Sequence, residues 1–162
     1  MSRSLKAATA SSPISKERLR LWLKLLKTSS LVEDEIRRRL RRDLNSTLPR
    51  FDVMSALARS QDGLKMSEIS KRLRVSNGNI TGIVDKLTEE GLALRVAVPG
   101  DRRASLVCLT PKGRTVFAQH AEIHESWIDE ILGGLNADDI EGMIRRLDHL
   151  TLKLEEKVSD GQ

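Results

Sequence analysis

Residues 65–110 read KMSEISKRLRVSNGNITGIVDKLTEEGLALRVAVPGDRRASLVCLT, and this stretch decides the fold. In its middle, the apolar side chains that recur with the spacing of one helical face are Ile80, Ile83, Val84 and Leu87. Such a stripe predicts an α-helix. Ser76 precedes the stripe and is expected to cap the first turn through its hydroxyl. Gly91 follows it, where a residue with positive φ commonly ends a helix.

A shorter helical pattern precedes this helix at residues 66–73, and only Arg74 and Val75 separate the two. Two helices joined by so short a turn form a helix-turn-helix, whose second helix enters the major groove of DNA. Amide and hydroxyl side chains can contact base edges, while a lysine or serine suits phosphates. The candidate DNA-binding residues of this recognition helix are therefore Ser76, Asn77, Asn79, Thr81 and Lys86.

After Gly91 the pattern changes from helix to strand. Residues 92–98 and 104–110 are rich in β-branched and aliphatic side chains, and the turn between them carries Arg102 and Arg103. Two strands around such a turn predict a hairpin with a positively charged tip. A basic hairpin beside a recognition helix is a wing, which contacts phosphates or the minor groove.

Several motifs of this chain also occur together in a known family. They are Asp101 and Arg103 followed by Leu109, Thr110, Pro111 and Gly113, with Phe51, Asp52 and Val53 upstream and the run Ile83, Val84, Asp85, Lys86, Leu87, Gly91 and Leu92. In these motifs the chain resembles the MarR family of bacterial transcriptional regulators, and the likeness extends over residues 18–158. The resemblance implies that Arg103 enters the minor groove, that Asp101 orients it, and that Arg102 contacts a phosphate.

The expected fold is mainly α, with six helices and a small β-hairpin wing. The winged helix-turn-helix occupies residues 47–110, between a first helix in residues 14–46 and two C-terminal helices in residues 111–158. A flexible arm at residues 1–13 and a short tail at residues 159–162 complete the chain.

Local signals mark where the flanking helices begin. Thr47 and Asn136 each precede a helical pattern and are expected to cap it, and Thr110 stands directly before Pro111 at a helix start. The first helix, of about 30 residues, is roughly 45 Å long and too long to bury itself in a small globule. The resemblance implies that this helix and residues 116–158 of two copies interlock, so we expect a homodimer.

Charge is distributed unevenly along the 162 residues, whose formal net charge is +5. Residues 1–60 hold 14 Lys and Arg against 6 Asp and Glu, whereas residues 116–162 hold 4 against 11. A basic half suits nucleic acid. A basic first helix against the acidic C-terminal part of a partner would also suit the expected dimer.

The densest charge run is at residues 37–42, where five of six positions are arginine. One interpretation is a solvated helix face paired with the acids Glu33, Asp34 and Glu35 one turn earlier. Other interpretations are contacts to DNA phosphates, to acidic residues of a partner subunit, or to an anionic effector. The resemblance implies an effector between the dimer helices and the winged domain. Such effectors are often aromatic acids, and the arginines favour a CoA thioester of an aromatic or aliphatic acid.

The candidate effector-binding residues are Trp22, Leu26, Arg37, Arg38, Arg41, Arg42 and Phe51. Two histidines, His120 and His124, are spaced to share a metal, but no third ligand has convincing spacing, so we expect exposed helix residues there. Cys108, the single cysteine, lies in the second wing strand without a basic neighbour, so a redox-sensing role is not expected. We expect no metal and no cofactor.

Catalysis finds no support, because the chain has no nucleophile elbow, glycine-rich phosphate loop or metal-ligand cluster. One cysteine allows no internal disulfide, the N-terminus lacks a signal-peptide core, and no apolar run is long enough to span a membrane. We therefore expect a cytoplasmic protein that is not an enzyme.

These observations predict a homodimeric repressor of transcription. It would bind a pseudo-palindromic operator in double-stranded DNA, with two recognition helices about 34 Å apart, and an effector would release it. The alternative is an architectural DNA-binding dimer with no effector. Footprinting separates the two, since a regulator protects a discrete symmetric site and leaves it when the ligand is added.

Overall fold

The computed structural model describes residues 13–73 and 77–161, and it forms two compact units, Met1–His120 and Ala121–Gln162. Within the described residues the expected six helices and the hairpin wing are present, with one additional short strand. In chain order the elements are α1 (Pro13–Leu44), α2 (Leu48–Ala58), β1 (Leu64–Lys65), α3 (Met66–Leu73), α4 (Asn77–Glu89), β2 (Ala93–Val98), β3 (Asp101–Leu109), α5 (Pro111–Ile131) and α6 (Ala137–Asp160).

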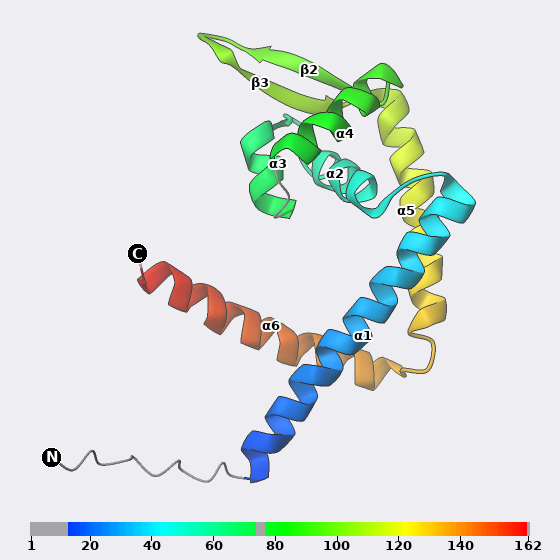
Figure 1. Ribbon diagram of the computed structural model, residues 1–162, viewed down its shortest axis with the longest axis vertical. Coiled ribbons are helices and arrows are strands. Elements are labelled where there is room, and N and C mark those ends of the chain that lie inside the picture. The colour runs from blue at the N-terminus through cyan, green and yellow to red at the C-terminus, as the bar shows by residue number, and fades with distance from the viewer. Residues whose placement is uncertain (1–12, 74–76, 162) are drawn as a thin grey trace, which may run out of the picture. The chain divides into compact units, whose positions relative to one another are not determined.

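The helix-turn-helix is formed by α3 and α4, which lie close to α2 (Figure 1). The inward stripe of α4 is confirmed, since Ile80, Val84 and Leu87 are fully buried and Ile83 is partly buried. Gly91 has a φ of +73°, as expected for the residue that ends this helix. The turn before α4, which includes the expected cap Ser76, lies outside the described residues.

The core of the first unit is aliphatic, as a chain with 2% aromatic residues requires. It gathers side chains from α2, α3, α4 and all three strands; its fully enclosed members include Val53, Leu57, Ile69, Ile80, Val84, Leu87 and Val107. One aromatic pair lies beside it, with the ring centroids of Phe51 and Phe117 5.5 Å apart. Recognition helix and wing are thus positioned by one shared core.

The three strands form an antiparallel sheet in the order β1-β3-β2, and β2 and β3 make the long hairpin in Figure 1. Strand β1 was not expected, because two residues carry no periodic pattern. Its Leu64 pairs with Val107 of β3. The hairpin turn is shorter than predicted. It consists of Pro99 and Gly100, the latter with φ +84°, so Arg102 and Arg103 lie at the start of β3 rather than in the turn.

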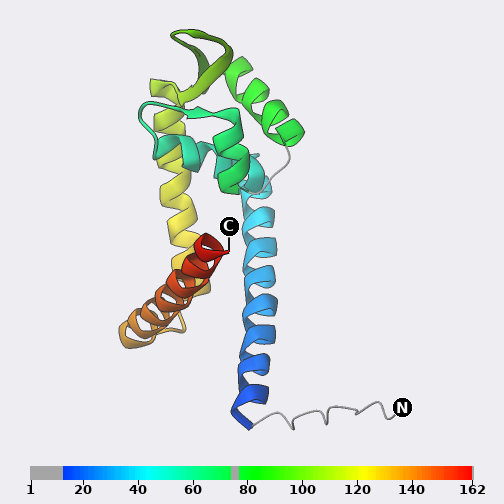
Figure 2. The same ribbon diagram turned by 90° about the vertical axis from the view of Figure 1, so that its left-hand side faces the viewer.

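Helix α1 is one continuous helix of 32 residues, about 48 Å long, and it leads into α2 (Figure 2). Only Ile36 and Leu40 of α1 are buried. The helix ends at Asn45, which has a φ of +46°, and the Ser46 N–H donates to the Leu40 carbonyl over 3.1 Å. Thr47 then caps α2 by accepting the Arg50 N–H at 3.3 Å, as expected.

In the second unit, α6 begins with the expected Asn136 cap. Asn136 and Asp139 form a reciprocal capping box, in which each side chain accepts the backbone N–H of the other residue. No residue of α6 is buried, and its apolar residues are exposed, from 40% at Ile140 to 70% at Val158. Among the helices of residues 13–73 and 77–161, none has the length and apolar character needed to cross a membrane.

Candidate nucleic-acid interface

The outward face of α4 is polar and open. Asn79, Thr81 and Lys86 are exposed there, in agreement with a surface that contacts another molecule. Asn77 is the first residue of α4, and its side chain is not described; Ser76 lies outside the described residues. Of the five candidate residues on this helix, three therefore have a described and accessible side chain.

An ion pair joins α4 to the wing. Arg95 of β2 donates from Nη2 to Oδ1 of Asp85 over 2.6 Å, and both side chains are about half exposed. The pair compensates the charge of the Asp85 carboxylate beside the outward face of α4. Sequence patterns did not single out Arg95, because a pairing between a helix and a strand depends on the fold of the hairpin.

At the start of β3, Asp101 accepts the backbone N–H of Arg103 at 3.0 Å. The carboxylate thus orients the Arg103 backbone, whereas the family pattern suggested orientation of the side chain. Arg102 and Arg103 are exposed, and neither has an ion-pair partner in the part of the chain that the structure describes. Both guanidinium groups are available to phosphates or the minor groove.

Most arginines of residues 37–42 are paired along α1. Glu35 forms ion pairs with both Arg38 and Arg39. Glu33 lies 3.6 Å from Arg37, and Asp43 pairs with Arg42 at 2.6 Å. The Arg39 hydrogen bond, with the Arg38 charge, holds the pKa of Glu35 below its usual value. Much of the run is therefore a solvated, paired face, as one of the interpretations expected. These exposed pairs contribute little to stability.

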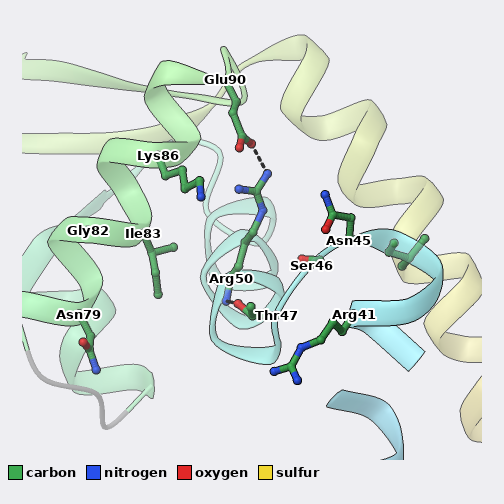
Figure 3. A pocket seen from close by; sticks show the side chains of 11 residues that line it. Arg41, Asn45, Ser46, Thr47, Arg50, Asn79, Gly82, Ile83, Lys86 and Glu90 are labelled. Atoms are coloured by element: carbon green, nitrogen blue, oxygen red, sulfur yellow. Dashed lines mark hydrogen bonds and ion pairs between the residues drawn. The ribbon is translucent and has the colours of Figure 1, made fainter. Parts of the chain in front are cut away.

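Two adjoining cavities lie where the end of α1, the start of α2 and the outer side of α4 meet, and Figure 3 shows the first of them. The first has a volume of about 720 Å³ and the second about 480 Å³. Both are lined by Arg41, Thr47, Asn79 and Ile83. The first cavity adds Arg50 and Lys86, so three cationic side chains surround it, and the second adds Arg37.

Arg50 occupies the first turn of α2 and donates to the Glu90 carboxylate just beyond α4 (Figure 3). This hydrogen bond holds the pKa of Glu90 below its usual value, and the charges of Arg50, Lys86 and Lys112 act in the same direction. Arg50 was missed in the sequence. Its only local signal is a lone cation in the otherwise apolar start of α2.

The candidate effector-binding residues do not form one site. Arg37 and Arg41 line the cavities, while Arg38 and Arg42 pair with neighbouring acids. Trp22 and Leu26 are exposed on α1 by 55% and 47% and line none of these cavities. Phe51 is only 8% exposed and packs on Phe117, so its side chain belongs to the interior and not to a ligand surface.

The two histidines of α5 are half-buried rather than exposed, contrary to expectation. Burial lowers the pKa of both His120 and His124, and the charge of Arg50 lowers that of His120 further. Within residues 13–73 and 77–161, no group of three or more metal-ligating side chains is present. Cys108 is a free, partly buried thiol in β3.

Known proteins with this arrangement are transcriptional regulators. The model of the MarR family matches residues 43–104. The HTH-type transcriptional regulator MhqR of Bacillus subtilis (strain 168) is 28% identical over 76% of this chain and 83% of its own length.

Solved structures of MarR family regulators share the fold of this protein over most of the chain. A MarR family transcriptional regulator from Silicibacter pomeroyi is 30% identical, has a TM-score of 0.72, and is matched over 89% of this chain and 99% of its own. Sco3205 of Streptomyces coelicolor, a MarR family regulator crystallised with DNA, shares the fold at 20% identity and a TM-score of 0.72, over 89% and 91% of the two chains. The chain therefore belongs to the MarR family, and it is a DNA-binding transcriptional regulator rather than an enzyme.

Proposed function

We propose that the protein is a homodimeric repressor that binds a pseudo-palindromic operator and leaves it when an anionic effector binds. The observation that carries the DNA-binding mode is the Asp85–Arg95 ion pair. Beside this ion pair, the outward side chains of α4 and the adjacent Arg102 and Arg103 at the start of β3 form one surface. Asn79 and Thr81 face the major groove, Lys86 and Arg102 the phosphates, and Arg103 the minor groove.

The dimer is supported by apolar surface that a single copy leaves uncovered. On α1, Leu19, Leu21, Trp22, Leu23 and Leu31 are each exposed by 55% or more, and α6 exposes an apolar stripe along its length. So many exposed large apolar side chains on each helix support an interface there. The basic α1 and the acidic α6 are suited to approach each other across two copies. The DNA complex of Sco3205 supports the use of this fold on duplex DNA.

The effector proposal rests on the two basic cavities. Arg41, Arg50 and Lys86 attract an anion, and the volume of the first cavity suits a ligand of small-molecule size. Among the described lining residues only Leu44 and Ile83 are apolar, and none is aromatic. This lining favours the phosphates of a CoA thioester over the ring of a free aromatic acid, with Arg37 and Arg41 as phosphate contacts.

Footprinting on the promoter region of the gene tests the operator proposal. We expect a protected site with two half-sites about one helical turn apart. Uniform coverage of any duplex, unchanged by ligand, would instead support the architectural dimer. Sedimentation velocity tests the dimer, and a monomer at micromolar concentration contradicts it.

Calorimetry with benzoate and benzoyl-CoA tests the effector class. We expect the thioester to bind more tightly, because only the thioester brings phosphates to the arginines. Tighter binding of the free acid refutes the CoA proposal and leaves the aromatic acid.

A further inference from the structure

The first cavity already holds an anionic group, and that group is a side chain of the protein itself. Of the described residues that line it, Glu90 alone is acidic, among the cations Arg41, Arg50 and Lys86 (Figure 3). Its carboxylate accepts a hydrogen bond from Arg50, which is only 20% exposed. The pairing joins positions 40 residues apart, the first turn of α2 and the end of the recognition helix.

We infer that Glu90 is the resident occupant of an anion site centred on Arg50, and that an external carboxylate or phosphate displaces it and frees the end of α4. The inference rests on the proposed function and deepens it, since it names the contact through which an effector would act.

Exchange is favoured over simultaneous binding for an electrostatic reason. A second anion at Arg50 would lie within a few ångströms of the Glu90 carboxylate, where like charges repel each other. The Arg50 side chain is only 20% exposed, so solvent screens this repulsion less than it would at an open surface. A ligand with two or more anionic oxygens can also reach Arg41 and Lys86, which Glu90 does not neutralise by any described ion pair.

The position of Glu90 gives the exchange a consequence beyond the cavity. The Glu90 carbonyl accepts Lys112 Nζ at 3.2 Å, and the Gly91 carbonyl accepts the Thr110 hydroxyl at 2.7 Å. The Leu92 carbonyl accepts the Thr110 N–H at 3.0 Å. Residues 90–92 are thus bound to the start of α5, and they lead directly into β2. Release of Glu90 therefore removes the one restraint that holds this junction to α2 through an ion pair.

The cavity also shares side chains with the DNA-binding surface. Asn79 and Lys86 line it and are candidate contacts to DNA. An anion in the cavity would engage the same lysine that meets a phosphate. Binding of the anion and of the operator would then oppose each other, and the coupling must be equal in both directions.

The test uses the full-length protein and three substitutions. Glu90→Gln removes the resident charge with little change of shape. Glu89→Gln removes the same charge one residue earlier, at the last residue of α4, where no ion pair is present among the described residues, and is the matched control. Arg50→Gln removes the centre of the site. The probes are benzoate and coenzyme A, titrated by calorimetry without DNA and at constant ionic strength set with sodium chloride.

We expect Glu90→Gln to bind at least one probe roughly two- to fivefold more tightly than the wild type, the range for loss of a competing ion pair. Glu89→Gln should bind it as the wild type does, and Arg50→Gln should bind it much more weakly. With operator DNA present, the probe should weaken DNA binding by the wild type. Hydrogen exchange at residues 88–92 should rise when the probe binds the wild type.

Three results overturn the inference: equal probe affinity in Glu90→Gln and the wild type, an equal gain in Glu89→Gln, or binding of neither probe to the wild type. Failure of the proposed function is distinguishable, because the probe titrations contain no DNA. A wild type that shows no preference for its promoter, while Glu90→Gln still binds the probe more tightly, rejects the operator and keeps the exchange.

Discussion

Asp85 on the recognition helix and Arg95 on the first wing strand are joined by an ion pair of 2.6 Å. The pair links the recognition helix to the wing. Because both side chains are about half exposed, its value to the protein lies in orientation more than in stability.

Replacing Asp85 with Asn should therefore separate these two quantities. Thermal unfolding should shift little, since exposed pairs are worth about 0.2–1 kcal/mol. Operator affinity should fall, because the wing is no longer held to α4 by the ion pair. Arg95→Gln should lower the affinity by the same amount. A double variant no weaker than either single variant would identify the pair as the unit that acts, by the logic of a double-mutant cycle. Losses of operator affinity that add in the double variant, measured by fluorescence anisotropy, would instead show two independent DNA contacts.

Arg103→Ala should weaken operator binding by about 1–3 kcal/mol and reduce the salt slope by about one. Its guanidinium is exposed at the start of β3 and has no described ion pair, so nothing within the described chain competes with DNA for it. Lys153→Ala on α6 is the control for net charge, because it removes one positive charge from the other unit. Anisotropy over a salt series measures both quantities. Equal losses of operator affinity in the two variants would mean that net charge determines binding and the position of Arg103 does not.

Gly113→Ala should destabilise the protein by about 1–3 kcal/mol or more, as overpacking does. A Cβ at this position would lie 1.9 Å from the Leu92 carbonyl oxygen, a backbone atom that cannot move aside without shifting β2. Gly142→Ala on α6 is the matched control. There the nearest atom is the end of the Arg146 side chain at 3.2 Å, and alanine favours the helix by about 1 kcal/mol. Urea unfolding should move the two midpoints in opposite directions.

Stability should fall with decreasing pH through His120 and His124. Burial holds the pKa of each below the ordinary value of 6.5, so the folded protein takes up these protons less readily than the unfolded chain. Their contribution is present in full above that value and is lost as pH falls through the lowered folded-state pKa. The double variant His120→Asn with His124→Asn should flatten the stability profile below pH 6.5.

Local sequence signals predicted the elements well. The stripe of Ile80, Val84 and Leu87 is the buried face of α4, and the caps at Thr47, Thr110 and Asn136 form as expected. These features depend on neighbours within a few residues, which the sequence displays directly.

The candidate site depended on contacts that no local pattern reveals. Arg50 meets Glu90 only because the core brings the start of α2 beside the end of α4. Phe51 belongs to a helix whose start faces the cavity, yet its ring turns toward Phe117. Strand β1 forms by pairing with β3, and a strand of two residues is too short to show a periodic pattern in the sequence. Side chains far apart in the chain converge through tertiary packing, which periodicity does not describe.

The close approach of Gly113 to Leu92 makes the joint between wing and α5 a stiff one. The Leu92 carbonyl is held by the Thr110 amide, and the space beside it has no clearance for even a methyl group. We therefore expect the wing to follow any change in the tilt of the first turn of α5, because the two segments are in direct backbone contact.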